Sequence, residues 1–183
     1  MLKKTGLILL ALTLAAGMVF VGCTGNSGPG SEWEITSGFK LSAHGSQADK
    51  VTVNDALGTV KMTSTPANSI AFGIIFPTEA NPDGYTWDMY SSLTVEIEIA
   101  ARATGKVQLI IKNNGTSFTN ATMVNDGNLY PQIGNGETVG HKTTTDPIST
   151  STLTDRVVFQ HDSGGGGDDI DYTLKINKIT FIP

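Results

Sequence analysis

Serines and aspartates are abundant in this chain, but the residues of types that carry out catalysis form no familiar catalytic motif. His44, His141 and His161 are far apart and lack the spacing of a zinc site, and the nucleophile pattern Gly-x-Ser-x-Gly is absent. Glu96 and Glu98 alternate with apolar residues, so they would share the outer face of one strand rather than flank a cleft. The sequence therefore predicts a protein that is not an enzyme. A hydrolase is the alternative, and it would need a pocket that brings a histidine within hydrogen-bond reach of a serine or a carboxylate.

An acidic, glycine-rich segment, HDSGGGGDDIDY over residues 161–172, has the composition of a calcium-binding loop. Calcium prefers oxygen ligands, and four glycines would let the backbone wrap around an ion. The spacing matches neither an EF-hand nor a calcium-binding repeat, so a solvated hairpin loop is the competing interpretation. We predict no cofactor beyond a candidate structural calcium ion. Its carboxylate ligands would be Asp162, Asp168, Asp169 and Asp171.

The stretch from Tyr85 to Asn113 has the clearest strand pattern in the chain. Apolar residues alternate with polar residues on both sides of Gly105. The alternation predicts two strands joined as a long antiparallel hairpin, with one face in the core and the other in water. On the wet face, Lys112 would lie beside Glu96 and Glu98.

Short β-type segments separated by turn residues follow one another along most of the chain. The nearly continuous apolar run Ile70 to Phe76 predicts a strand covered on both faces, in which Gly73 marks a bulge or a close approach. The last strand should dock beside an early strand, and its pattern breaks between Ile176 and Ile179 as a bulge would break it. Roughly eight strands without a convincing amphipathic helix predict an all-β fold, an antiparallel β-sandwich.

The first 22 residues have the pattern of a secretory signal peptide. Lys3 and Lys4 precede an apolar run from Leu7 to Val21, which Gly22 ends. The run is too short and too unevenly flanked to predict a membrane span. The mature chain would then begin at Cys23.

Cys23 is the only cysteine, so it cannot form an internal disulfide. Together with the small residue before it, Cys23 resembles the lipobox of a bacterial lipoprotein precursor. The resemblance implies that Cys23 carries two or three acyl chains, which would anchor the protein firmly to a lipid bilayer. The protein would then lie in the cell envelope, on the periplasmic or the extracellular face. An ordinary signal peptide with an incidental cysteine is the alternative.

Composition divides the rest of the chain and limits its partners. Residues 23–31 are rich in Gly and Ser and predict a flexible tether, and residues 32–183 form the predicted β-sandwich domain. The formal net charge is -5, and removal of the signal peptide would make the protein more acidic. An acidic surface disfavours nucleic acid as a partner.

The chain contains the strand-like segments DMYSSLTVEIE (88–98), GKVQLIIKN (105–113) and YTLKINKITFI (172–182). Together they resemble the galactose-binding-like jelly-roll domains, notably the carbohydrate-binding modules of bacterial secreted proteins. The resemblance implies a jelly-roll sandwich and sugar binding. In those modules a structural calcium often uses an acid in the closing strand, where this chain has Asn177.

Aromatic side chains are the natural sugar contacts, because the apolar face of a pyranose packs on an exposed ring. Tyr90 and Tyr172 begin predicted strands and are expected in the core. Tyr85, Trp87 and Tyr130 lie in turn-rich segments and are the candidate sugar-binding residues, with packing against the core as the alternative for each.

The sequence thus predicts a membrane-anchored, non-catalytic carbohydrate-binding lipoprotein. Its partners would be the bilayer, through Cys23, and a poly- or oligosaccharide. The alternative is a cell-surface structural or adhesion protein that binds another protein.

Overall fold

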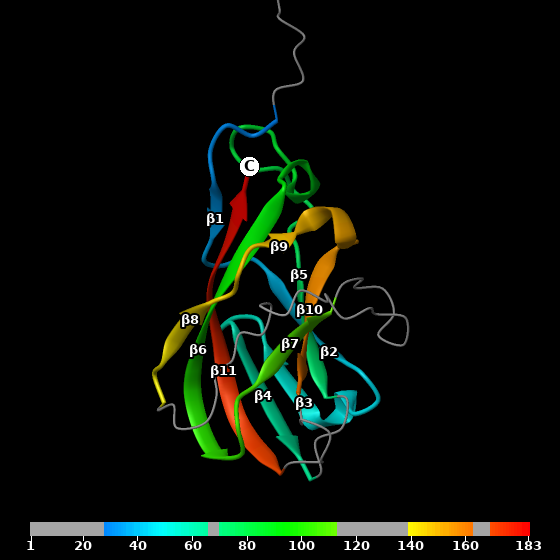
Figure 1. Ribbon diagram of the computed structural model, residues 1–183, viewed down its shortest axis with the longest axis vertical. Helices are drawn as coiled ribbons and strands as arrows, with labels where there is room; N and C mark the ends of the chain where they lie inside the picture. The colour runs from blue at the N-terminus through cyan, green and yellow to red at the C-terminus, as the bar shows by residue number, and fades with distance from the viewer. Residues whose placement is uncertain (1–27, 66–69, 113–138, 163–168) are drawn as a thin grey trace, which may run out of the picture.

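The protein folds as an antiparallel β-sandwich (Figure 1). The computed structural model describes residues 28–65, 70–112, 139–162 and 169–183, so Cys23, Tyr130 and Asp168 lie outside the described residues. Two antiparallel sheets face each other, which confirms the predicted all-β jelly-roll sandwich. In the described ranges, no helix is long and apolar enough to cross a membrane. The described residues include three short 3-10 turns: η1 (Ala48–Lys50), η2 (Trp87–Met89) and η4 (Thr150–Thr152).

The two sheets differ in size. The larger sheet has the order β3 (Val51–Asn54), β4 (Thr59–Ser64), β11 (Ile170–Ile182), β6 (Ser92–Thr104) and β8 (Lys142–Thr144), with β1 (Trp33–Ile35) beside β11 and β9 (Ile148–Ser149) beside β6. The smaller sheet has the order β2 (Lys40–His44), β5 (Ala71–Ile75), β10 (Arg156–His161) and β7 (Leu109–Lys112).

Strands β6 and β11 form the centre of the larger sheet. They pair from Ser92 opposite Ile182 to Thr104 opposite Asp171. A register shift between Ile176 and Lys178 confirms the predicted bulge in the last strand. Strand β11 also pairs with β4, which confirms that the last strand docks beside an early one.

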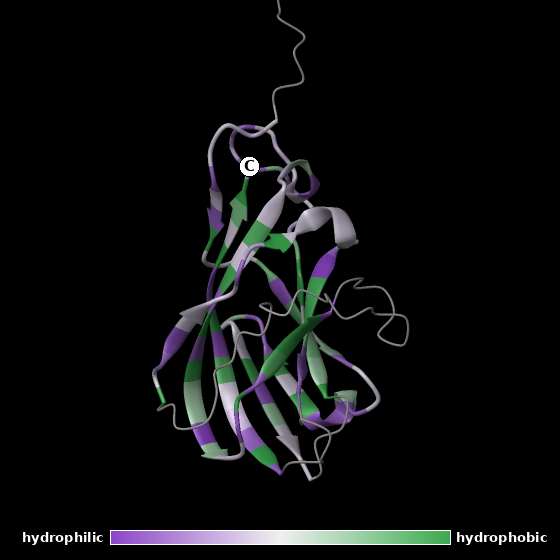
Figure 2. Cartoon of the chain, viewed as in Figure 1, coloured by the Kyte–Doolittle hydropathy of each residue, from purple (hydrophilic) through white to green (hydrophobic). Residues whose placement is uncertain are grey.

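The core lies between the inner faces of the two sheets, and Figure 2 shows hydrophobic residues alternating along the strands that enclose it. Strand β6 contributes four side chains with no exposed area: Leu93, Val95, Ile97 and Ile99. From the smaller sheet, the rings of Phe72 and Phe159 stack with centroids 5.3 Å apart. Fully burying one such side chain stabilises the fold by about 1.5–3 kcal/mol, so the alternation itself selects this arrangement.

The predicted hairpin over residues 85–113 is wrong. Strand β6 pairs with β8, β9 and β11, whereas β7 pairs with β10 in the other sheet. The chain therefore crosses from one sheet to the other near Gly105, whose φ is 84°. Both arrangements bury the same alternate residues, so the pattern could not distinguish them. Lys112 consequently lies in a different sheet from Glu96 and Glu98.

A polar contact between two described residues crosses the core. The hydroxyl of Tyr172 on β11 lies 3.2 Å from Nδ1 of His161 on β10, and both residues are at most 1% exposed. Burial raises the pKa of the Tyr172 hydroxyl far above its usual value. The phenol therefore remains neutral, and the hydrogen bond links the two sheets.

Tyr172→Phe should reduce the free energy of unfolding by about 1–2 kcal/mol, because it leaves a buried imidazole nitrogen without this hydroxyl. Urea denaturation monitored by circular dichroism measures the change. Tyr85→Phe, which removes a hydroxyl from a half-buried ring, is the control and should have a smaller effect. Equal stabilities of the Tyr172→Phe variant and the parent would contradict this role.

Candidate functional site

Asn81 organises the loop that carries two of the candidate aromatic residues. Its side-chain oxygen accepts hydrogen bonds from the backbone N–H groups of Asp83 (3.0 Å) and Tyr85 (2.9 Å). Its amide group donates to the hydroxyl of Tyr90 at 2.9 Å in a buried contact. The backbone of Tyr90 is fixed in turn, because its carbonyl accepts a hydrogen bond from the hydroxyl of Thr150. The loop is therefore held in one conformation against the sandwich.

The loop aromatics are half-buried and contact the core. Tyr85 and Trp87 both pack against the hydrophobic core, and the ring of Trp87 lies 4.8 Å from that of Phe76. The structure brings these two candidate residues together on one loop, but their role in sugar binding stays a prediction, as does that of Tyr130. Tyr90 and Tyr172 are 2% and 1% exposed, which confirms that both belong to the core.

The acidic segment is distributed over two sheets. Asp162 follows β10 and accepts a hydrogen bond from Gln108 at 3.3 Å, whereas Asp171 on β11 lies 3.4 Å from Nζ of Lys61. Asp169 is exposed. Within the part of the chain that the structure describes, no group of three or more His, Cys, Asp or Glu side chains could hold a metal ion. The calcium site, which includes Asp168, stays a prediction.

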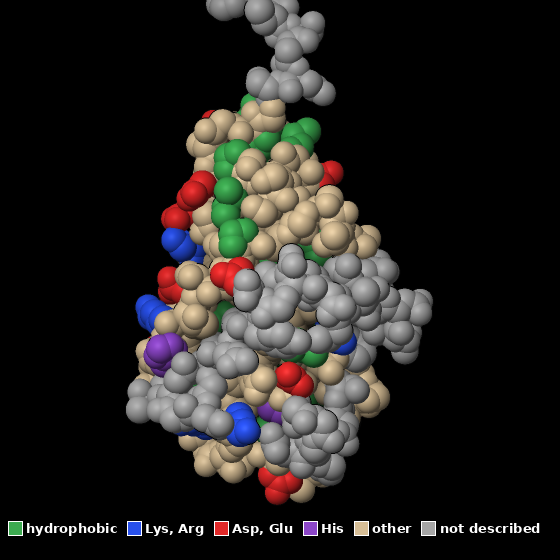
Figure 3. Space-filling view, in the orientation of Figure 1, with side chains coloured by type: hydrophobic (Ala, Val, Ile, Leu, Met, Phe, Trp, Pro, Cys, Tyr) green, Lys and Arg blue, Asp and Glu red, His purple; other side chains and the backbone are tan. Residues whose placement is uncertain are grey.

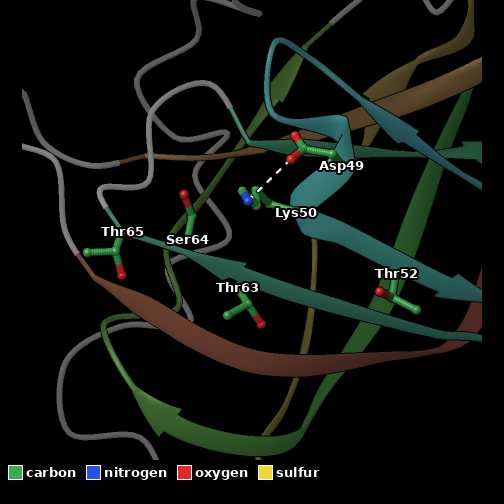
Figure 4. Close-up of a pocket in the computed structure, with 6 residues that line it drawn as sticks. All are labelled: Asp49, Lys50, Thr52, Thr63, Ser64 and Thr65. Carbon is green, nitrogen blue, oxygen red and sulfur yellow. Dashed lines mark ion pairs between the residues drawn. The ribbon is translucent and has the colours of Figure 1, made fainter.

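A pocket of about 400 Å³ lies where η1 meets β3 and β4 (Figure 4). Its lining consists of hydroxyl-bearing side chains and one ion pair, Asp49 with Lys50 at 3.3 Å: Asp49, Lys50, Thr52, Thr63, Ser64 and Thr65. Such a lining offers hydrogen bonds but no ring on which a sugar could stack.

The outer face of the smaller sheet carries a second polar group of residues. Side chains alternate between the faces of a strand, so Phe72 and Ile74 point into the core while Gly73 belongs to the outer face. Gly73 pairs with Ser42 on β2 and with Val158 on β10. The residues beside it on those strands therefore gather above the backbone of Gly73.

The missing side chain of Gly73 makes room for this group. A Cβ atom at Gly73 would lie 2.7 Å from Nε2 of His44 and 2.8 Å from Oγ of Ser42. The imidazole and the hydroxyl thus occupy the space that any other residue would fill. This confirms the close approach that the sequence predicted at Gly73.

Four residues join in one hydrogen-bonded group, which we call the His44 cluster: Ser42, His44, Asp155 and Arg156. Nε2 of His44 lies 2.9 Å from Oγ of Ser42 and 3.3 Å from Nη1 of Arg156. Arg156 also donates from Nε (2.8 Å) and Nη2 (2.7 Å) to the two carboxylate oxygens of Asp155. Because a guanidinium group only donates, Nε2 of His44 accepts, and the neutral ring carries its proton on Nδ1.

Sequence reasoning missed the His44 cluster. The alternation of β2 could have placed Ser42 and His44 on one face, because they are two residues apart. Nothing local indicates Arg156, which is 112 residues away from His44 in the sequence. Only the position of β5 between β2 and β10 brings them together.

Charges within the cluster oppose base catalysis. Burial and the neighbouring Arg156 lower the pKa of His44, and Asp155 opposes this shift. The hydrogen bond from Arg156 lowers the pKa of Asp155. The geometry that a hydrolase requires, a serine within reach of a histidine, is present here. A proton taken from Ser42 would nevertheless create an imidazolium facing a guanidinium, which charge repulsion disfavours.

His44 should titrate with a midpoint below 6.5, its ordinary pKa. As the pH falls through 6.5, the unfolded chain binds this proton more readily than the folded protein, so the free energy of unfolding decreases toward the folded-state pKa. Above 6.5 this contribution to stability is fully present.

NMR titration of the imidazole measures the midpoint. Arg156→Gln should raise the midpoint, because it removes the positive charge beside His44 while the negative charge of Asp155 remains. Lys61→Ala, on the other sheet, should leave it unchanged. A midpoint at or above 6.5 in the parent protein would show that the cluster is not formed as described.

Comparisons with known proteins give a broad structural likeness. No model of a protein family matches the chain, and no curated protein matches it. Among solved structures, a variant of the family 29 carbohydrate-binding module CBM29-2 has 13% sequence identity and a TM-score of 0.43, over 82% of this chain and 91% of the other. A cleaved adhesin domain of Lys-gingipain from Porphyromonas gingivalis has 17% identity and a TM-score of 0.36, over 86% of this chain and 94% of the other. Similarity at this level transfers no residue role.

Proposed function

We propose that this chain is a membrane-anchored, non-catalytic carbohydrate-binding lipoprotein of the cell envelope, which binds sugar with the His44 cluster. The observation that carries the proposal is the hydrogen-bonded arrangement of this cluster above Gly73 on the outer face of the smaller sheet. Lipid anchoring through Cys23 is supported by the sequence pattern around that residue.

The chemistry of the cluster suits a neutral sugar. Each sugar hydroxyl can donate and accept a hydrogen bond, and the cluster offers carboxylate acceptors, guanidinium donors and a serine hydroxyl side by side. The side chains of Asp155 and Arg156 are 44% and 20% exposed, so both can be reached from solvent. Because the two charges compensate each other at 2.7 Å, the pair attracts an anionic ligand weakly. A neutral polyol is therefore the preferred partner.

The cluster is also fixed before any ligand binds. Its members lie on or beside regular strands, and two hydrogen bonds from Arg156 to Asp155 restrict both side chains. A ligand that meets such groups does not have to order them, which reduces the entropic cost of binding.

The second candidate is a structural or adhesion protein that binds another protein. The packing of Trp87 on Phe76 favours it, because a ring held by the core is less free to stack on a sugar. In that case, crosslinking in the cell envelope would recover a protein partner, and a glycan array would give no signal.

The proposal is tested by a broad glycan array probed with the intact protein, followed by titration of the best neutral oligosaccharide. Arg156→Ala should weaken binding by roughly 10- to 100-fold, the loss expected when a charged hydrogen-bond donor is removed. Lys61→Ala removes a cation from the outer face of the larger sheet and should leave binding unchanged. Circular dichroism confirms that each variant is folded. Affinity should change little between low and high salt, because the charges of the cluster are paired. Absence of binding across the array, or equal effects of the two variants, would refute the proposal.

A further inference from the structure

We infer that the end of the domain bearing Tyr85, Trp87 and Met89 is a contact surface for zwitterionic phospholipid and lies on the bilayer to which the chain is anchored. We call these three residues the tether-end surface. The inference rests on the lipid anchoring included in the proposed function, and it gives the loop aromatics a role other than sugar binding.

The described chain begins beside this surface. A Cβ atom at Gly28 would lie 3.9 Å from the carbonyl oxygen of Met89, and the next residue, Pro29, is buried. Figure 1 shows the chain entering the domain at the end that holds η2 and the C-terminus. Gly28 and Pro29, which the sequence assigned to the tether of residues 23–31, are therefore held next to η2.

The chain between the anchor and this point is short. Cys23 precedes Gly28 by five residues, and an extended chain spans at most about 3.6 Å per residue, so the two are separated by no more than about 18 Å. The headgroup region on each side of a bilayer is itself roughly 5–8 Å thick. An acylated Cys23 would thus hold the tether-end surface close to the lipid headgroups.

The side chains at this end suit a lipid interface. Met89 is 55% exposed, which is unusual for a large hydrophobic residue, and Tyr85 and Trp87 are half-buried. Figure 3 shows hydrophobic side chains gathered at this end of the molecule. Tyr and Trp are favoured where a membrane meets water, because their rings have an apolar body and a polar group.

The charge of the same segment selects the type of lipid. The exposed residues Glu79, Asp83 and Asp88 are near the aromatic residues in the sequence, and residues 77–91 contain no Lys or Arg. Carboxylates repel anionic headgroups, so the contact depends on apolar burial against zwitterionic lipid.

This placement also orients the pocket at η1. The His44 cluster lies on and beside β2 and β10 of the smaller sheet, whereas the Thr-lined pocket at η1 lies at the end opposite the tether (Figure 1). With the tether-end surface on the bilayer, this pocket would face away from the membrane.

Fluorescence quenching in vesicles tests the inference. The full-length lipidated chain carrying Trp33→Phe retains Trp87 as its only tryptophan. It is reconstituted into phosphatidylcholine vesicles that contain brominated phosphatidylcholine near the headgroups. Trp87 fluorescence should be quenched, and Met89→Asp should reduce the quenching at least twofold. Leu57→Asp changes a residue that is 63% exposed on the turn between β3 and β4 and should have no effect.

The outcomes separate the inference from the proposed function. Mass spectrometry first establishes whether Cys23 carries acyl chains. An unmodified Cys23 would overturn both the lipid anchoring and this inference. An acylated Cys23 with no quenching of Trp87 would overturn the inference alone. Replacing part of the phosphatidylcholine with phosphatidylglycerol should lower the quenching, and an increase would contradict the assignment to zwitterionic lipid.

Discussion

The structure depends on the antiparallel pairing of two 13-residue strands, β6 and β11. Strands β1 and β4 pair with β11, and β8 and β9 pair with β6, so the larger sheet is assembled around this pair. Its inner face, with Leu93 to Ile99 on β6 and Leu174 to Phe181 on β11, supplies the surface on which the smaller sheet packs. The smaller sheet is then held in a fixed position, and the His44 cluster with it.

This constraint fixes the positions of the side chains that form the His44 cluster. The outward side chains of β2, β5 and β10 are positioned by register, and the register is determined by the inward residues that the core requires. Gly73 then provides the space that Ser42 and His44 share. The fold and the candidate site are therefore linked through the same three strands, because a shift of one residue would exchange the two faces.

The sequence predicted the features that depend on alternation within one strand. It did not predict the features that depend on which distant strands pair. The all-β sandwich, the burial of Tyr90 and Tyr172, the bulge after Ile176 and the close approach at Gly73 follow from patterns within single strands. The partner of β6 did not follow, since a hairpin and a crossing between sheets bury the same residues. The His44 cluster could not be predicted either, because β5 lies between the two strands that contribute it. The acylation of Cys23, the role of Tyr130 in sugar binding and the calcium site at the aspartates stay predictions.

NMR mapping of backbone amide shifts during titration with a neutral oligosaccharide would locate the bound sugar. If sugar binds above Gly73 as proposed, the largest shifts should occur at Ser42, His44, Gly73 and Arg156, four residues from three adjacent strands. Shifts confined to the loop of Tyr85 and Trp87, or to the pocket of Thr52 and Thr63, would contradict sugar binding at the His44 cluster.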